Sequence, residues 1–245
     1  MYLQDYIWFL GAILVCMVFS GIASAKVRSA FSKHDRYSCR SGLTGYATAS
    51  RLLRENGVYD VSVGQVGGFL SDHYHPSRGI VNLSESTYGS SSVAAVAVAA
   101  HEIGHVMQKK EGYGLYRLRT ALVPVVNIGT RLAMPLVLVG LLLDLAVTAV
   151  DGNTGFYIAM VGVILYGGAL LFALVTLPVE LNASRRAKRM LAESGILAPD
   201  EMSGAGDVLS AAALTYLASL LTSIVYFLRF LVYVLTVFGR RSDRR

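Results

Sequence analysis

The strongest constraint on how this chain can fold is the set of long apolar runs between its charged residues. Ile7–Ala25 carries no charge, and Leu209–Phe238 is interrupted by Arg229 alone. Two further apolar runs, Met134–Val150 and Phe156–Val179, are separated by a short turn-rich link. A helix needs about 20 mostly apolar residues to cross the ~30 Å hydrocarbon core of a bilayer. The sequence therefore predicts a mainly α-helical integral membrane protein that crosses the membrane several times.

The charged residues point to the same class of protein. They make up only 16% of the chain, whereas soluble globular proteins carry about 25%. The net charge of +6 comes largely from basic clusters beside the apolar runs, at Lys26–Arg40, Arg185–Arg189 and Arg240–Arg245. Such clusters are typical of cytoplasmic juxtamembrane segments that contact anionic lipid. Because no nucleic-acid motif accompanies them, we predict the lipid bilayer, and no nucleic acid, as their partner.

The first apolar run is interpreted as a membrane anchor and not as a cleaved signal peptide. A signal peptide begins with positive residues, whereas here Asp5 precedes the run and Lys26 follows it. We divide the chain into a transmembrane anchor (1–25), a polar region (26–130), a transmembrane helical hairpin (131–179), a helix opened by Pro178 (180–208), and an apolar helix with a basic tail (209–245).

The polar region combines helices with short strands. Residues 42–56 have helical spacing and end at Gly57, whereas residues 58–66 and 80–83 alternate like strands. A polar stretch then leads into Val93–Gln108, which is predicted to be a helix. This region is therefore of the α+β type.

The motif H-E-x-x-H lies on that last helix, as His101, Glu102 and His105. Residues i and i+4 share one face of a helix, so both imidazoles can bind one zinc ion, while the glutamate can act as general base on a zinc-bound water. Two surface histidines and a glutamate are the ordinary alternative. It is disfavoured because the helix is slim enough to be buried, and Gly104 lets another backbone approach. The alanines that make it slim are Ala94, Ala95, Ala97, Ala99 and Ala100.

A catalytic zinc ion normally has three protein ligands and one open position. Besides the other carboxylates, the candidates for the third ligand are His34, His73, His75 and Glu180. Glu180 is the best of these, and Ser184 lies one turn later on the same helix face. The alternative is that Glu180 is a first-turn glutamate that complements the helix dipole. The residues alone favour neither interpretation.

Several stretches resemble the YugP-type membrane zinc metallopeptidases of bacteria. They are GGFLSDHY (67–74), SVAAVAVAAHEIGHVMQ (92–108), LPVELNASRR (177–186) and LSAAALTY (209–216). More distantly, the layout is similar to the HtpX-type gluzincin proteases, in which a membrane hairpin separates the H-E-x-x-H helix from an E-x-x-A-D helix that carries the glutamate ligand. The resemblance implies that Glu180 is the third zinc ligand. It also implies that Ser184 replaces an acidic partner of a zinc histidine, and so adds no negative charge.

The resemblance implies further roles around the site. His73 is either an oxyanion donor or a cap of the hairpin, whereas His75, where the family tends to have an acidic residue, is interpreted as a cap. Tyr216 is a candidate oxyanion donor, although aromatic residues in apolar helices usually serve packing. An edge strand that holds an extended peptide substrate is expected at Gly67, Gly68, Phe69 and Leu70. A simple hairpin edge is the alternative there.

These observations predict a zinc-dependent endopeptidase in the membrane. One zinc ion is held by His101, His105 and Glu180, with Glu102 as the general base. The small zincin-like catalytic unit is interrupted by the transmembrane hairpin. The alternative is a non-catalytic membrane protein with a structural or regulatory metal site, which a fourth ligand such as His34 or His73 would close. A channel or transporter is disfavoured because Arg229 and the other charges in the runs lie near span ends, where they can snorkel.

The expected substrates are peptides or membrane proteins near the surface of the bacterial plasma (inner) membrane. Basic residues follow the first apolar run, so the positive-inside rule places the catalytic region in the cytoplasm. Asp151–Gly155 then lies outside and Glu180 returns to the cytoplasmic side. A crossing by Leu209–Phe238 would put the basic tail outside, against the rule. We expect that the first part of this run packs on the catalytic unit and that Leu214–Phe238 crosses; the alternative is a run that folds back.

Overall fold

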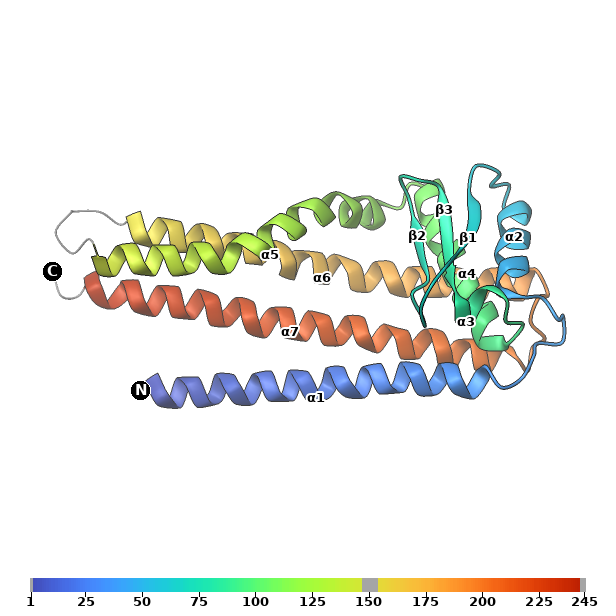
Figure 1. The fold of residues 1–245 in the computed structure, drawn as a ribbon, viewed down its shortest axis with the longest axis horizontal. Helices are drawn as coiled ribbons and strands as arrows, with labels where there is room; N and C mark the ends of the chain where they lie inside the picture. Colours follow the sequence, from blue (N-terminus) through green and yellow to red (C-terminus); the bar gives the residue numbers. More distant parts are fainter. Residues whose placement is uncertain (1, 147–153, 243–245) are drawn as a thin grey trace. The chain divides into compact units, whose positions relative to one another are not determined.

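The computed structural model describes residues 2–146 and 154–242, and these residues are mainly α-helical (Figure 1). The elements in chain order are α1 (Tyr2–His34), α2 (Gly45–Glu55), β1 (Ser62–Val66), β2 (His73–His75), β3 (Ile80–Ser84), α3 (Glu85–Tyr88), α4 (Val93–Lys110), α5 (Gly114–Ala146), α6 (Thr154–Glu193) and α7 (Met202–Ser242).

In this described part of the chain, four helices are long and apolar enough to cross a membrane. They comprise Ile7–His34, Gly114–Gly140, Thr154–Glu193 and Met202–Thr236. The protein is therefore a multi-pass membrane protein, as the apolar runs predict. Residues 151–153 of the expected Asp151–Gly155 turn lie outside the described residues, and α6 begins at Thr154.

The prediction that Pro178 opens a new helix is wrong. α6 is continuous from Thr154 to Glu193, and Pro178 lies inside it. A proline has no N–H to donate to the preceding turn, but membrane helices tolerate it because neighbouring groups and local adjustments satisfy the freed carbonyl. Glu180 is therefore not a first-turn residue. The helix-dipole interpretation of Glu180 loses its basis.

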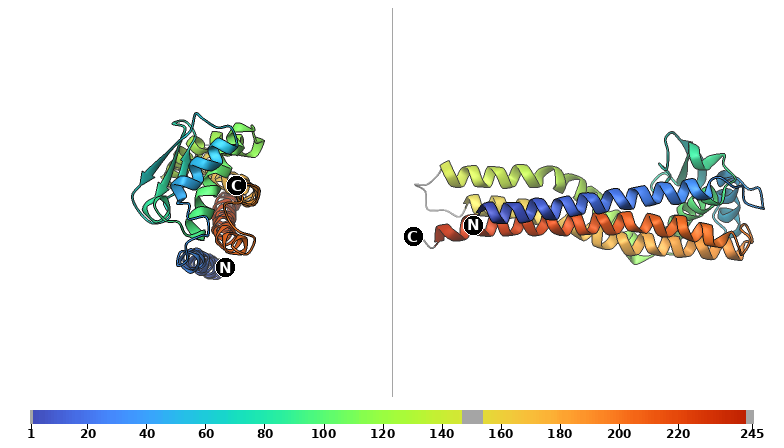
Figure 2. Two further views of the ribbon diagram at one scale, coloured as in Figure 1. Left: turned by 90° about the vertical axis from the view of Figure 1, so that its right-hand side faces the viewer. Right: turned by 90° about the horizontal axis from the view of Figure 1, so that it is seen from below.

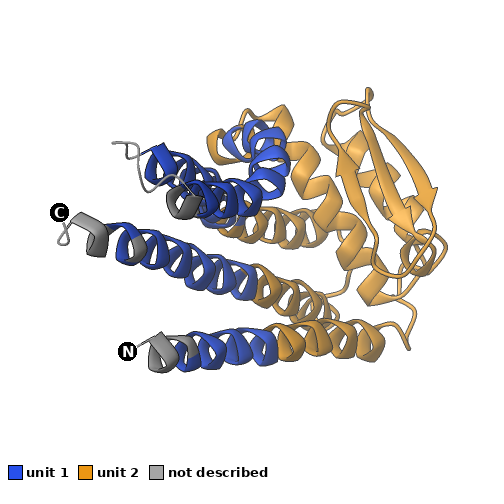
Figure 3. Cartoon of the chain, turned by 60° about the vertical axis from the view of Figure 1, so that its left-hand side comes forward, with its two compact units in different colours: residues 1–19, 118–176, 217–245 blue, residues 20–117, 177–216 orange. Residues whose placement is uncertain are grey.

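The chain divides into two compact units, which Figure 3 distinguishes by colour. Unit 1 consists of residues 1–19, 118–176 and 217–245, and unit 2 of residues 20–117 and 177–216. Each of the four long helices has residues in both units. The residues of α7 up to Tyr216 belong to unit 2 and those from Leu217 to unit 1, and the helix is continuous. The prediction that Leu214–Phe238 crosses the membrane stays a prediction.

Unit 1 is built by close packing of small residues between α5 and α6. A Cβ atom on Gly162 would lie 2.6 Å from the carbonyl oxygen of Ala133. The two backbones therefore approach as closely as glycine allows, which is how membrane helices gain contact in the absence of a hydrophobic driving force. The guanidinium of Arg229 lies 5.0 Å from the ring centre of Phe9 and 5.5 Å from that of Tyr233, so two cation–π contacts stabilise this charge.

Unit 2 contains a three-stranded sheet in the order β1-β3-β2. β1 pairs in parallel with β3 (Ser62 opposite Ile80), and β2 pairs antiparallel with β3 (His73 opposite Asn82). α2 and α4 pack together beside the sheet (Figures 1 and 2). α4 supplies much of the hydrophobic core, which positions the H-E-x-x-H motif inside the unit.

The expected edge strand at residues 67–70 is not a strand. These residues form bends after β1, with positive φ at Gly68 (103°) and at Leu70 (53°). Such φ values cannot continue a pleated strand, so the backbone turns away from β3. The edge strands of the sheet are β1 and β2, and the chain returns to the sheet at His73.

Candidate metal centre

The centre is built on α4, whose sequence makes it a buried helix. Ser92 caps its N-terminus by accepting a hydrogen bond from the backbone N–H of Ala95 (3.1 Å), and its hydroxyl donates to Asp35 (2.6 Å). The alanines that follow are fully buried, and because they are small the helix can be surrounded on several sides. His101 and His105 then lie one turn apart with ring centres separated by 4.8 Å.

Gly104 brings the second element, α6, against α4. A Cβ atom at this position would lie 2.6 Å from the carbonyl oxygen of Ala183. No side chain fits at that distance, so the two backbones are in direct contact. This close approach places Glu180 and Ser184, one turn apart on α6, beside the two histidines.

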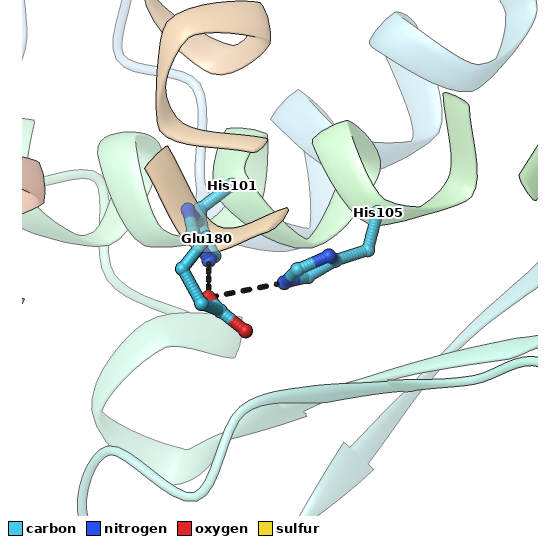
Figure 4. A group of neighbouring side chains, drawn as sticks. All are labelled: His101, His105 and Glu180. Carbon is cyan, nitrogen blue, oxygen red and sulfur yellow. Dashed lines mark hydrogen bonds and ion pairs between the residues drawn. The ribbon is translucent and has the colours of Figure 1, made fainter. Parts of the chain in front are cut away.

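Three potential metal donors meet at this point (Figure 4). The Oε2 atom of Glu180 lies 3.1 Å from Nε2 of His101 and 3.4 Å from Nε2 of His105. One ligand atom from each of the three residues falls within 4.8 Å of the others. The side chains are almost fully enclosed, with 2% exposure for Glu180 and 13% and 9% for the histidines.

A glutamine that sequence reasoning missed orients His105. The amide nitrogen of Gln108 donates to the carbonyl of Val179 (2.8 Å) and to Oδ1 of Asn182 (3.0 Å). Its Oε1 therefore acts as an acceptor, at 2.9 Å from Nδ1 of His105. Neutral His105 therefore carries its proton on Nδ1, which leaves a lone pair on Nε2 facing Glu180. The available signal was the i, i+3 spacing from His105, which places both residues on one helix face.

Ser184 stands in the equivalent position behind His101. Its hydroxyl lies 3.2 Å from Nδ1 of His101. A hydrogen bond at Nδ1 directs the other ring nitrogen toward Glu180, as partners of metal-bound histidines commonly do.

Glu102 lies next to the three donors and is buried, with 6% exposure. Burial raises the pKa of its carboxyl group to about 7; neighbouring His101 opposes the rise, whereas the charges of Glu180 and Asp72 add to it. The backbone of Tyr74, in edge strand β2, hydrogen-bonds to the carboxylate. The edge strand beside Glu102 is thus β2 and not residues 67–70.

Glu102 and His101 face a cavity of about 400 Å³ in unit 2. Of the residues expected around the site, Phe69, Leu70 and Tyr216 line this cavity, whereas Gly67 and Gly68 do not. Asp72, which the sequence did not single out, also lines it. Its carboxylate accepts hydrogen bonds from the backbone N–H (2.7 Å) and the hydroxyl (2.8 Å) of Ser84.

The remaining candidate histidines lie elsewhere. His73 uses Nδ1 with the carbonyl of Ser71 (2.9 Å) and Nε2 with the amide of Asn82 (3.0 Å), so both ring nitrogens are engaged beside the sheet. His75 contacts the hydroxyl of Ser77 (3.2 Å), and His34 pairs with Asp207 (3.0 Å). Neither His34 nor His73 belongs to the donor group among the residues described.

Comparison with known proteins identifies the family. The family described as "Putative neutral zinc metallopeptidase" matches residues 8–235, which is nearly the whole chain. The chain belongs to this family. The "Putative membrane protease YugP" of Bacillus subtilis (strain 168) is 44% identical over 210 residues, covering 86% of this chain and 89% of that protein. The YugP-type resemblance is therefore confirmed. No solved structure matches the chain.

The family description names zinc, and the donor group of this chain fits that ion. Two imidazole nitrogens and one carboxylate oxygen are a donor set found at catalytic zinc sites. The lone pair of His105 Nε2 faces the lone pairs of the Glu180 carboxylate. Two acceptors that face each other in a buried site repel unless a cation lies between them.

Proposed function

We propose that this protein is a zinc-dependent endopeptidase of the membrane, with a small zincin-like catalytic unit formed by unit 2. The observation that carries the proposal is the convergence of His101, His105 and Glu180 within 4.8 Å. Buried Glu102 lies beside them, at a cavity wide enough for part of a substrate. A metal site alone would not require the carboxylate and the cavity.

His101, His105 and Glu180 would hold one zinc ion. Zinc supplies a Lewis acid and lowers the pKa of a bound water toward ~7, so that a nucleophile forms at neutral pH. Gln108 and Ser184 keep the two imidazoles in the orientation that the ion requires.

Glu102 is the general base in this proposal. Its carboxylate takes a proton from the attacking water and later donates that proton to the leaving nitrogen of the scissile amide. The burial of Glu102 keeps bulk water away from the carboxylate. Tyr216 lines the same cavity and would donate a hydrogen bond to the oxyanion.

The non-catalytic alternative needs a fourth protein ligand that closes the metal site. The donor group among the described residues has three members. His34 and His73, which could have served as the fourth, are bonded to other partners. A site with three ligands leaves a position for water or substrate, which favours the enzyme.

The proposed location is the bacterial plasma (inner) membrane, with unit 2 in the cytoplasm. The support is the basic stretch after the first apolar run, which carries Lys26, Arg28, Lys33, Arg36 and Arg40. Substrates would be peptides or membrane proteins near the bilayer surface.

The proposal is tested with Glu102→Gln in the purified full-length protein. This change should leave bound zinc in place and lower peptidase turnover by roughly 10²–10⁴-fold, because it removes the general base. Glu193→Gln is the matched control, since Glu193 is 70% exposed at the end of α6 and should have no effect. Near-wild-type turnover of zinc-loaded Glu102→Gln would remove the proposed mechanism.

A further inference from the structure

The cavity beside Glu102 is lined largely by residues that have no role in the proposed catalytic mechanism. Besides α4, its walls come from α1, from the loop of residues 67–72 and from α7. Apolar lining side chains include Val27 and Phe31 of α1, Phe69 and Leu70 of the loop, and Leu209 and Ala212 of α7. The charged lining residues are Arg28, Asp72 and Glu102, and Asp72 is already engaged by Ser84. The polar lining residues are His101, Ser24, Thr215 and Tyr216 besides these three, and the other eight of the fifteen are apolar.

The loop that forms one wall is held in place at both ends. The ring of Phe69 packs edge-on against that of Phe31 in α1, with centres 5.4 Å apart. The hydroxyl of Ser71 donates to the carbonyl of Gly67 (2.9 Å), and Asp72 is fixed to Ser84 at the end of β3. These contacts fix the conformation of the loop, and they also link α1 to the sheet.

Leu70 in this loop has an unusual backbone. Its φ of 53° lies in the left-handed region, which is unfavourable for a bulky residue. Strain of this kind persists only where surrounding contacts impose it, and it concentrates at ligand sites. The strained residue, Leu70, lines the same cavity as Glu102, the proposed general base.

The places of the lining residues along α1 and α7 indicate that the cavity lies near the membrane surface. The cavity-lining residues of α1 begin at Ser24, at the end of the charge-free run, and continue past Lys26. The lining residues of α7 run from Val208 to Tyr216, at the start of its long apolar run Leu209–Phe238. The change from apolar to charged sequence in a membrane helix marks the bilayer interface. An occupant of the cavity would therefore be bound near that level.

We propose that this cavity is a specificity subsite, which binds a large apolar side chain next to the scissile bond in substrate segments at the membrane surface. The anchor helix α1 forms part of the subsite. This inference rests on the proposed function. Pockets of about 300–1,000 Å³ accept drug-sized ligands, so a volume of about 400 Å³ accommodates a leucine or phenylalanine side chain together with adjoining backbone.

The first test varies the substrate. A single-span reporter protein carries a polar juxtamembrane tail in which one residue is Phe, Leu, Ala, Ser or Asp. The full-length enzyme is reconstituted in lipid with zinc, and kcat/KM and the cleavage position are measured. Because each methylene in an apolar pocket contributes a factor of roughly 10 or more, Leu and Phe reporters should be cleaved at least tenfold better than Ala, at a bond adjoining that residue.

The second test fills the cavity from two sides. Ala212→Phe on α7 and Val27→Phe on α1 should each lower the preference for Leu over Ala about tenfold, because the added ring takes the room of the substrate side chain. Ser210→Phe and Ser29→Phe are the matched controls, since both serines are exposed and neither lines the cavity. Two variants on different helices guard against one that fails to fold.

The outcomes separate this inference from the proposed function. Cleavage that depends on zinc and Glu102 but is equal for all reporters overturns the subsite and leaves the peptidase assignment intact. An apolar preference that both cavity-filling variants leave unchanged also overturns it. If no reporter is cleaved and Glu102→Gln behaves like the wild type, the proposed function fails, and the subsite fails with it.

Discussion

At the scale of single residues, the centre depends on side chains behind the donors as well as on the donors. Gln108 is fully buried and uses its amide nitrogen twice as a donor, so its oxygen must accept from His105. This arrangement fixes which ring nitrogen of His105 is free for a metal. Gln108 is not itself a metal ligand, but it determines which ring nitrogen of His105 can bind the metal.

The first prediction concerns that glutamine. Gln108→Met keeps the side-chain volume and removes the hydrogen bonds, so zinc affinity should fall by roughly 10–100-fold. Ser184→Ala should lower it by less, because Ser184 is only partly buried and its bond to His101 is longer. Affinity is measured by competition with a chromophoric chelator. Gln65→Met, at an exposed position of β1, is the control. Unchanged affinity in Gln108→Met would contradict the role assigned to Gln108.

How far the sequence predicted the donors depends on their separation along the chain. His101, Glu102 and His105 lie within five positions of one helix, so helical geometry alone brings them together. Glu180 lies 79 residues from His101, and no local rule links them. The residues made it a candidate for the third ligand, and the family resemblance decided between that role and a first-turn glutamate. Gln108 was missed because a glutamine three residues after a histidine is common on ordinary helices.

At the scale of elements, the contact between α4 and α6 is what assembles the donors. The glycine at the crossing and Glu180 are on different helices, so anything that separates the helices also separates the ligands. Gly104 has no room for a side chain, whereas Gly114, at the start of α5, has open space around it. This difference provides a matched pair of substitutions.

Gly104→Ala should therefore lower both stability and zinc affinity. The added methyl group overlaps the backbone of Ala183, and overpacking of this kind costs about 1–3 kcal/mol. Gly114→Ala should leave both properties unchanged. The thermal midpoint with and without chelator, together with zinc content, measures the effect. A Gly104→Ala protein as stable and as zinc-replete as the wild type would rule out direct backbone contact.

Two elements departed from the sequence prediction for physical reasons. Pro178 resembles a helix start in a soluble protein, but within a long apolar helix the lost hydrogen bond is tolerated. The expectation of a strand at residues 67–70 came from the resemblance to the edge strand that holds substrate in related proteases. The left-handed backbone at Leu70 turns them into a loop. Such φ values arise from tertiary contacts, which no local pattern contains.

At the scale of the whole molecule, we propose that unit 2 lies on the cytoplasmic side of the membrane. Single cysteines at Ser38 and Ser242, in a background with Cys16 and Cys39 replaced by alanine, test this with a membrane-impermeant thiol reagent. Ser38 is exposed in unit 2 and should be labelled only from the cytoplasmic side. Ser242, at the end of α7, should be labelled from outside if α7 crosses. Labelling of Ser38 from outside would overturn the orientation.

We propose that His101, His105 and Glu180 hold one zinc ion, and the zinc content of the purified protein tests this site. Zinc per chain is measured by elemental analysis in purified wild type, Glu180→Ala and the exposed control Glu193→Ala. We expect one zinc per chain in the wild type and the control, and a strong loss in Glu180→Ala. Full zinc content in Glu180→Ala, or a wild-type protein that binds no zinc, would contradict it.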